Sequence, residues 1–328
     1  MSVEDTDWDG VRLHIVTGKG GTGKTTVAAA LALALASGGK KVLLVEVEGR
    51  QGVAQLFDVP PLPYEERKVA VAHGGGEVFA LAIDTEEALI EYLEMFYNLR
   101  RAGKALTKLG VIDFVTTIAP GLRDVILTGK VTESVRRKEG RKFKYDAVVM
   151  DAPPTGRITQ FLNISDEVSN LAKVGPVRNH GDLVMSVIRS PQTRVHFVTL
   201  LEEMPVQETL DGIHDLGASG IGIGGVVVNM ERPAILSAEA LDSAGEGALD
   251  LEEVTRGLKA SGLEQHAADL AAALAAEAGE HSQRTGLEQR EKARITHRPR
   301  YDLPFLPDGM DLAGLYELAQ ALRDQGAA

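Results

Sequence analysis

The sequence predicts an α/β fold built on a doubly wound, mostly parallel sheet. Short apolar stretches rich in β-branched residues alternate with helical stretches, a pattern typical of a parallel sheet covered on both faces. A glycine-rich segment joins the first strand directly to the first helix. With 328 residues, 44% of them hydrophobic, the chain is long enough to bury a large core in one domain. The expected strands are residues 11–17, 41–48, 78–83, 146–150, 195–201, 225–229 and 301–306.

Helices are expected between these strands along the whole chain. The first is expected at residues 25–36, where Ala and Leu dominate, and the last at residues 312–322. We therefore expect a single domain over residues 11–328. Residues 1–10 are polar and acidic, so we expect a disordered N-terminus there and no signal peptide.

Two segments are longer than a crossover helix needs. Residues 85–141 are expected to form a helical insertion subdomain that starts near Asp84 and Glu87. Residues 237–297, rich in Ala and Glu, are expected to form two or three amphipathic helices. The apolar content of the first insertion predicts a hydrophobic groove for a partner or client, with an internal helical core as the alternative. Its apolar residues include Leu89, Ile90, Leu93, Phe96, Tyr97, Val111, Ile112, Phe114, Val115 and Ile118.

Composition excludes several classes of function. Lys and Arg total 35 against 47 Asp and Glu, and a net charge of −12 repels phosphate backbones, so no nucleic-acid partner is expected. The chain has no cysteine, which excludes disulfides, thiolate zinc sites, iron–sulfur clusters and cysteine nucleophiles. This composition fits a reducing cytoplasm. The longest apolar run, residues 27–36, is shorter than the roughly 20 residues of a membrane span.

The glycine-rich segment matches the phosphate-loop pattern G-x-x-x-x-G-K-[ST] in its required place between a strand and a helix. Glycines let backbone N–H groups curl around phosphate oxygens, and the helix N-terminus adds a positive dipole end. Lys24 is expected to reach the β- and γ-phosphates, and the Thr25 hydroxyl is expected to bind Mg²⁺. The segment therefore predicts a nucleotide-binding site. Its expected contact residues are Gly18, Lys19, Gly20, Gly21, Thr22, Gly23, Lys24, Thr25 and Thr26.

Lys19 is an additional lysine near the start of this loop, where it cannot easily reach its own nucleotide. A cation there suits the phosphates of a nucleotide bound by a facing subunit. It would neutralise charge in the transition state, as an arginine finger does. We therefore expect Lys19 to be catalytic across a dimer interface, with a surface lysine as the alternative.

Two polar residues end later strands beside the expected loop. Asp151 follows the strand at residues 146–150, where a carboxylate can hold Mg²⁺ partly through water; capping of the next turn is the alternative. Asn229 ends the strand at residues 225–229, and its amide can donate to and accept from the adenine edge at once. A strand-terminating turn is the alternative for Asn229.

Several segments resemble the ArsA-type anion-transporting ATPase family. The loop with its two lysines, Lys19 and Lys24, resembles the deviant Walker A motif of the MinD, ParA, nitrogenase-iron-protein and ArsA group. Residues 151–157, Asp-Ala-Pro-Pro-Thr-Gly-Arg, resemble the ArsA switch II signature Asp-x-Ala-Pro-Thr-Gly-His, with Arg157 in place of the histidine. Residues 197–209 resemble a strand–helix junction of the same family.

The resemblance covers most of residues 11–230 and the tail from residue 301. It implies a P-loop ATPase that hydrolyses ATP to ADP and phosphate with Mg²⁺ and acts as a nucleotide-switched dimer. The family includes arsenite-efflux ATPases and ATPases that target tail-anchored membrane proteins, which implies a membrane partner or a hydrophobic client. In the family an Asn at the position of Asn229 reads adenine. The family's last-strand loop forms a second wall of the base pocket, which implies this role for Pro304 and Pro307.

The chain departs from the family in the switch I segment. The family reads Asp-Pro-Ala-His after the second strand, and its Asp orients the attacking water. This chain reads Glu48-Gly49-Arg50-Gln51 instead. Glu48 keeps the carboxylate but adds one methylene, and a shift near 1 Å at a catalytic group can cost on the order of 100-fold in rate. We therefore expect Glu48 to position water in an ATPase that is slow without its partner.

Other departures concern partners. Without cysteine the family's Cys-x-x-Cys zinc bridge is missing, so no zinc is expected and dimerisation must rest on packing and nucleotide. The metalloid-sensing cysteines are missing too. Residues 85–141 contain one methionine, Met95, whereas tail-targeting members are rich in methionine there. The Glu-Gly-Arg-Gln segment resembles one member of a paralogous pair of such ATPases in actinobacteria, which implies a heterodimer as the alternative to a homodimer.

Three functional classes remain open. The first is an ATPase coupled to a membrane partner or a hydrophobic client, and the second is a weakly hydrolysing regulatory subunit of a heteromeric pair. The third is a ParA- or MinD-like positioning ATPase, which would need a basic surface or a basic C-terminal helix. Residues 312–328 carry Arg323 as their only cation, which counts against the third class. The expected location is the cytoplasm, with peripheral association at the membrane as the alternative.

Overall fold

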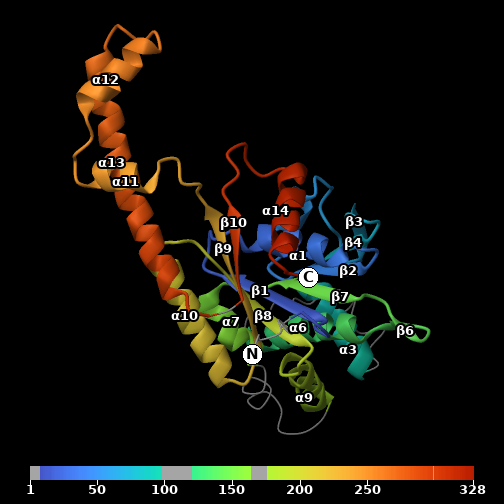
Figure 1. Ribbon diagram of the computed structural model, residues 1–328. Coiled ribbons are helices and arrows are strands. Elements are labelled where there is room, and N and C mark those ends of the chain that lie inside the picture. The colour runs from blue at the N-terminus through green and yellow to red at the C-terminus, as the bar shows by residue number, and fades with distance from the viewer. Residues whose placement is uncertain (1–7, 98–119, 164–175, 298) are drawn as a thin grey trace.

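The computed structural model describes residues 8–97, 120–163, 176–297 and 299–328 (Figure 1). Its main sheet has the strand order β10-β9-β8-β1-β7-β2-β4-β3, and neighbouring strands are parallel except for β3 and β4. The predicted doubly wound α/β fold is therefore confirmed. The strands of this sheet are β1 (Leu13–Gly18), β2 (Lys41–Glu46), β3 (Arg67–Val71), β4 (Glu77–Ala82), β7 (Ala147–Asp151), β8 (Thr193–Thr199), β9 (Ile223–Glu231) and β10 (Arg300–Pro304).

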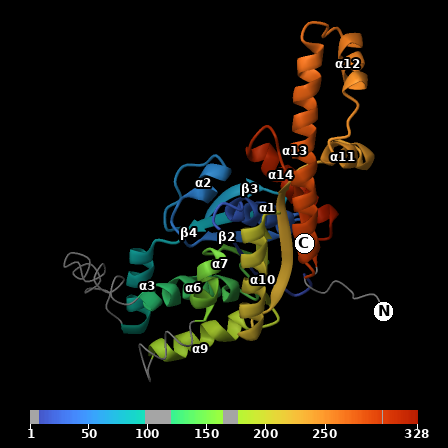
Figure 2. The same ribbon diagram turned by 90° about the vertical axis from the view of Figure 1, so that its left-hand side faces the viewer.

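Helices cover both faces of the sheet (Figure 2). One face is covered by α1 (Lys24–Ala36), α2 (Gly52–Leu56) and α14 (Leu312–Asp324). The other face is covered by α3 (Thr85–Tyr97), α6 (Pro120–Arg136), α7 (Thr155–Leu162), α9 (Pro176–Ile188) and α10 (Glu203–Ala218). A strand buried on both faces reads as a continuous apolar run. In β2, accordingly, Val42 and Leu44 enter one core while Leu43 and Val45 enter the other.

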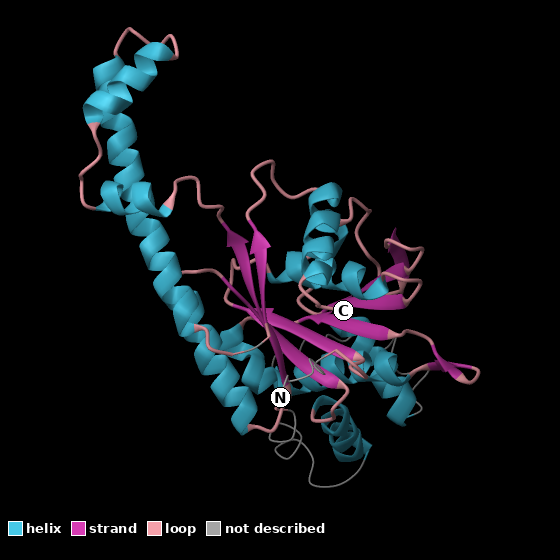
Figure 3. Cartoon of the chain, in the orientation of Figure 1, coloured by secondary structure: helices cyan, strands magenta, loops and turns pink. Residues whose placement is uncertain are grey.

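A helical arm extends away from the sheet (Figure 3). It consists of α11 (Ala238–Gly245), α12 (Leu251–Ala260) and the 28-residue α13 (Ala267–Arg294). At the base of the arm, Lys292 forms ion pairs with Glu231 of β9 at 2.5 Å and with Asp302 of β10 at 2.9 Å. These contacts join the end of α13 to the edge of the sheet, while α11 and α12 pack on α13 further out.

The chain enters the fold earlier than expected. The Trp8 ring stacks on the buried rings of His14 and His196, with centroids 5.3 and 4.9 Å away. Its indole N–H donates to the hydroxyl of Tyr301 at 2.7 Å. The disordered N-terminus predicted for residues 1–10 therefore does not extend to Trp8, because this aromatic side chain has a packing site against the sheet.

Two pairings were not predicted. The edge strand β3 pairs antiparallel with β4, and its residues are exposed or half-buried, so it lacks the apolar run of the inner strands. A short hairpin of β5 (Lys138–Glu139) and β6 (Lys142–Phe143) follows α6 at the end of the predicted helical insertion. Residues 98–119 of that insertion lie outside the described residues.

Candidate functional site

The predicted phosphate loop lies at the carboxyl end of β1, a central strand of the sheet. Gly21 and Gly23 have φ angles of 90° and 85°, in the left-handed region that favours glycine. A Cβ on Gly18 would lie 2.2 Å from the carbonyl oxygen of Val198 in β8, so a larger residue does not fit there. A Cβ on Gly20 would meet nothing within 4 Å. The loop thus has the open, glycine-dependent conformation that lets backbone N–H groups approach phosphates.

Hydrogen bonds hold the shape of the loop. Thr22 Oγ1 donates to the carbonyl oxygen of Lys19 at 2.9 Å. Asn229 Nδ2 donates to the carbonyl oxygen of Thr22, also at 2.9 Å. Asn229 is 4% exposed, and a Cβ on Gly23 would lie 2.4 Å from its Nδ2. Asn229 therefore braces the loop, a role that the sequence did not suggest, and its reading of adenine stays a prediction.

Thr25 and Asp151 are joined directly, because Thr25 Oγ1 donates to Asp151 Oδ2 at 2.7 Å. Burial raises the pKa of Asp151 to about 6, although the Thr25 hydrogen bond and the Lys24 charge oppose this rise. The other oxygen, Oδ1, is buried and has no hydrogen-bond partner in the described part of the chain. A hydroxyl beside a carboxylate with an unpaired oxygen is the donor set that Mg²⁺ prefers. These two residues therefore fit the metal assigned to them.

A second buried carboxylate, Glu46, was not predicted. It is the last residue of β2 and lies beside Asp151 in the register of β2 and β7. Its Oε2 accepts from the backbone N–H of Val53 at 3.0 Å, and its buried Oε1 has no hydrogen-bond partner among the described residues. Its charge is one of the smaller contributions that raise the pKa of Asp151. The available signal was a charged residue ending the apolar strand KVLLVE.

Lys19 is paired within its own chain. Its Nζ forms an ion pair with Glu208 of α10, and the other Glu208 oxygen accepts from Thr155 Oγ1 at 2.9 Å. Glu208 therefore joins the phosphate loop to the first residue of α7. The pKa of Glu208 is lowered, with the Lys19 hydrogen bond as the largest cause. No sequence pattern indicates this contact, since 189 positions separate the two residues. The predicted role of Lys19 across a dimer interface stays a prediction.

The switch I segment and the segment after Asp151 carry two further ion pairs. Glu48 and Arg50 lie 3.7 Å apart, and Arg157 pairs with Asp124 of α6 at 3.3 Å. The Glu48 charge also contributes to the raised pKa of Asp151. Glu48 is thus close enough to influence the candidate metal site, and its role in positioning water stays a prediction.

The remaining predicted site residues lie around the loop and on the last strand. Lys24 begins α1 and is 8% exposed, and Thr26 is half-buried in the first turn of that helix. Pro304 ends β10 and is half-buried, whereas Pro307 is exposed. The predicted roles of the two prolines in a base pocket remain predictions.

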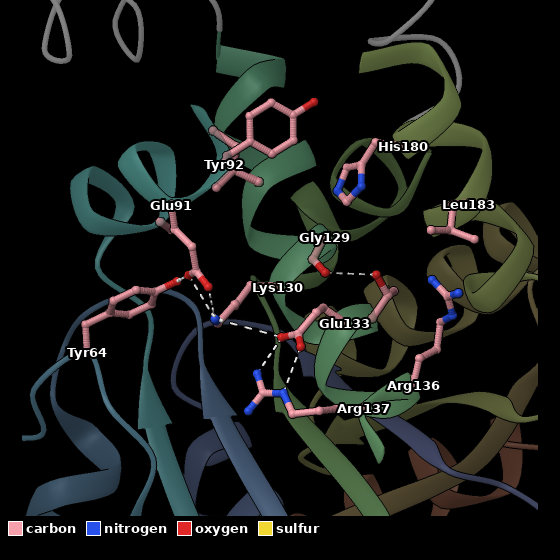
Figure 4. Close-up of a pocket in the computed structure, with 13 residues that line it drawn as sticks. Tyr64, Glu91, Tyr92, Gly129, Lys130, Glu133, Arg136, Arg137, His180 and Leu183 are labelled. Carbon is pink, nitrogen blue, oxygen red and sulfur yellow. Dashed lines mark hydrogen bonds and ion pairs between the residues drawn. The ribbon is translucent and has the colours of Figure 1, made fainter. Parts of the chain in front are cut away.

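A separate cavity of about 310 Å³ lies among α3, α6 and α9 (Figure 4). Lys130 contacts both carboxylate oxygens of Glu91 at 2.8 Å, and the Tyr64 hydroxyl donates to the same carboxylate at 2.6 Å. Beside them, Arg137 pairs with Glu133. The apolar part of the lining is Ala88, Tyr92, Ile126 and Leu183.

Several residues of this cavity belong to the insertion that was predicted to form a hydrophobic groove. Ile126, an apolar residue within the predicted insertion at residues 85–141, is buried in the cavity wall. Ile112 and Phe114 lie outside the described residues, as does the side chain of Phe96. The groove therefore stays a prediction.

Similarity to known proteins extends over the residues that form this site. A family model described as anion-transporting ATPase matches residues 11–191, which contain the phosphate loop and Asp151. The chain belongs to this family. It is 54% identical over 320 residues to the ATPase BagA of Mycobacterium tuberculosis, covering 97% of this chain and 94% of that protein.

More distant similarity extends to other ATPases. The ATPase GET3 of Kluyveromyces lactis is 28% identical over 183 residues, which are 51% of each chain. The arsenical pump-driving ATPase of Escherichia coli is 26% identical over 244 residues, 66% of this chain and 39% of that protein. The resemblance to ArsA-type proteins is confirmed, and this member of the anion-transporting ATPase family is a nucleotide-binding hydrolase. Within the described residues, every helix is too short or too polar to cross a membrane.

Proposed function

We propose that this anion-transporting ATPase family member binds ATP with Mg²⁺, hydrolyses it to ADP and phosphate, and acts as a nucleotide-switched dimer. The observation that carries the proposal is the contact between Thr25 and Asp151 beside the glycine loop, with Asp151 Oδ1 buried and unpaired among the described residues. The loop amides and Lys24 bind the phosphates, while Thr25 and Asp151 hold the metal, partly through water. When bound, Mg²⁺ neutralises charge on the phosphate oxygens.

The other site residues complete the proposed reaction. Glu48 orients the attacking water, and Lys19 exchanges Glu208 for the phosphates of a nucleotide in the facing subunit. This exchange is physically reasonable because the ion pair is about one-third exposed and therefore weak. Asn229, Pro304 and Pro307 surround the base.

The proposed partners are a second copy or a paralogous ATPase, together with a membrane protein or a hydrophobic client. The cavity among α3, α6 and α9 supports the client, because apolar side chains form much of its wall. The relative from Escherichia coli is named for driving an arsenical pump. This chain has no cysteine to bind a metalloid, which favours a different cargo. We place the protein in the cytoplasm or at the membrane periphery.

A second candidate function is that of a weakly hydrolysing regulatory subunit. The pairing of Glu48 with Arg50 favours it, because a carboxylate held by a cation is a poorer partner for water. In this case the catalytic turnover resides in the paralogous subunit.

A steady-state assay of ATP hydrolysis tests the proposal. We expect Mg²⁺-dependent release of ADP and phosphate by the purified chain, alone or with its paralogue, and loss of this activity in Lys24→Ala. Lys68→Ala, which changes a lysine of the edge strand β3, is the matched control and should keep the activity. Equal rates in Lys24→Ala and Lys68→Ala would contradict the proposed site, and turnover only in the presence of the paralogue would favour the regulatory subunit.

A further inference from the structure

A small polar cavity of about 160 Å³ lies where the end of β2, α6 and α7 meet, next to the candidate nucleotide site. Three arginines from separate segments contribute to it, namely Arg50 from switch I, Arg123 from α6 and Arg157 from α7. Its remaining lining residues are Val47, Glu48, Leu127, Pro153 and Phe161. The lining therefore carries three guanidinium groups and one carboxylate, and its net charge is positive.

The arginines differ in how well they are paired. Arg50 lies 3.7 Å from Glu48, and Arg157 lies 3.3 Å from Asp124, which is not part of the lining. Arg123 Nε is buried and has no hydrogen-bond partner among the described residues. None of the ion pairs within the described part of the chain includes Arg123, and an anion in the cavity would supply the counter-charge that its guanidinium lacks. The lining therefore lacks an anion that all three arginines can share.

Two of these arginines are also departures from the family pattern. Arg50 stands where the switch I pattern Asp-Pro-Ala-His has alanine, and Arg157 stands where the switch II pattern has histidine. The two replacements lie in different segments, yet both bring a guanidinium to the same cavity. Guanidinium groups recognise oxyanions with paired, charge-assisted hydrogen bonds.

We propose that this cavity binds a tetrahedral oxyanion, with inorganic phosphate as the natural occupant. A volume of about 160 Å³ is several times the roughly 30 Å³ of one water molecule, so an ion of the size of phosphate fits in the cavity. The cavity borders Pro153, two residues after Asp151, so phosphate released from the nucleotide site has a short path to it. The source of the phosphate, but not the binding site, rests on the proposed ATPase reaction.

Calorimetry with inorganic phosphate tests the site, with Lys24→Ala as the background because this variant removes phosphate binding by the loop. We expect phosphate to bind Lys24→Ala, and the added change Arg123→Gln to weaken binding by about tenfold or more, the effect of losing a charge-assisted hydrogen bond. Arg50→Ala and Arg157→His, which restore the family residues, should also weaken binding. Arg141→Gln, an exposed arginine of the hairpin, is the matched control and should leave it unchanged.

The outcomes separate this proposal from the ATPase proposal. The oxyanion site is overturned if phosphate does not bind Lys24→Ala, or if it binds Arg123→Gln and Arg141→Gln equally in that background. The ATPase proposal has its own readout, which is ATP binding by the wild type. Thermal unfolding of each variant shows whether it is folded, and Arg50→Ala changes a side chain that is 73% exposed, so it should fold.

The source of the phosphate is tested by single-turnover kinetics of the wild-type chain with its partner. Acid quenching measures cleavage, and a fluorescent phosphate sensor measures release. A delay between cleavage and release that shortens in Arg123→Gln identifies the occupant as the product of the reaction. Cleavage and release without a delay, together with Arg123-dependent calorimetric binding, identify phosphate taken from solution.

Discussion

Lys19 of the phosphate loop is ion-paired with Glu208 of α10 in the same chain. The same carboxylate accepts a hydrogen bond from Thr155, which follows the candidate metal ligand Asp151 closely in sequence. One acidic side chain therefore contacts both the lysine proposed to act on a facing subunit and the segment that the family uses as a switch. For Lys19 to act on another nucleotide, its pairing with Glu208 must first be broken.

Glu208→Gln is expected to raise the ATPase rate at low concentrations of partner subunit, because Lys19 no longer has to leave a carboxylate. The rate is measured against partner concentration, with Glu203→Gln at the exposed start of α10 as the control. Lys19→Ala should erase stimulation by the partner in both backgrounds. A lone chain that turns over rapidly and is unaffected by Lys19→Ala would show that the lysine does not act between subunits.

Glu48→Asp is expected to raise or preserve the basal ATPase rate. The shorter side chain restores the carboxylate length that the family uses to orient water, and a misplacement near 1 Å costs on the order of 100-fold. Single-turnover rates at saturating ATP measure the effect. Glu48→Gln serves as the control, since it keeps the length but removes the charge. A Glu48→Gln variant with the full wild-type rate would exclude Glu48 from the reaction.

Asn229→Leu is expected to reduce nucleotide affinity and to narrow the preference for ATP over GTP. The substitution removes the hydrogen bond from Asn229 to Thr22. The carbonyl oxygen of Thr22 is then unpaired, at a free-energy cost of about 1–3 kcal/mol. Calorimetry with both nucleotides separates two roles of this residue. Loss of affinity for ATP and GTP by the same factor indicates bracing of the loop alone, whereas a larger loss for ATP indicates contact with adenine.

Asp151→Asn is expected to stabilise the nucleotide-free protein while it weakens Mg²⁺-dependent ATP binding. Burial raises the pKa of Asp151 to about 6, so the folded state retains a proton that the unfolded state releases near pH 4. Stability due to this group is therefore lost as pH rises from about 4 to 6. The increase in the free energy of unfolding caused by Asp151→Asn should be about 1 kcal/mol larger at pH 7 than at pH 5. Urea unfolding at both pH values measures it, and a pH-independent gain would argue against the raised pKa.

The buried pair His14 and His196 should make the protein sensitive to acid. Their ring nitrogens Nδ1 and Nε2 lie 3.1 Å apart, and burial lowers the pKa of His196 to about 3 and that of His14 well below its usual value. The folded state then binds fewer protons than the unfolded state below pH 6.5. Its stability should fall by up to about 1.4 kcal/mol per pH unit for each histidine.

His14→Asn tests this dependence, because asparagine can still pair with His196 but does not titrate. The free energy of unfolding, measured in urea from pH 7 to pH 5, should depend on pH less steeply in this variant than in the wild type. His266→Asn changes an exposed histidine and is the control. Equal slopes in His14→Asn and the wild type would show that the pair does not govern the acid response.

The features that could be predicted best from the sequence are those that depend only on residues close together in the chain. The loop from Gly18 to Thr25 could be predicted because its glycines and its position between a strand and a helix depend only on nearby residues. The strand β2 was recognised by its apolar run, and its confirmed place in the sheet brings Glu46 beside Asp151. The sequence could not reveal that neighbourhood, because it is set by the register of two strands about a hundred residues apart.

Contacts between distant segments explain the other omissions. Glu208 meets Lys19, and the arginines from switch I, α6 and α7 share one cavity, only after the sheet has brought these segments together. The edge strand β3 was not predicted, for a different reason. Because β3 lies at the edge of the sheet and its residues are exposed or half-buried, Arg67 and Lys68 are tolerated in it and an apolar run is absent.

The arm built on α13 has a mechanical consequence. With 28 residues and a rise of 1.5 Å per residue, α13 is roughly 42 Å long. Its fixed end is the point where Lys292 contacts Glu231 of β9 and Asp302 of β10. A tilt of about 5° at this point moves the far end of a helix of that length by roughly 4 Å. A small tilt at the edge of the sheet would therefore become a displacement comparable to the width of a side chain at the far end of α13.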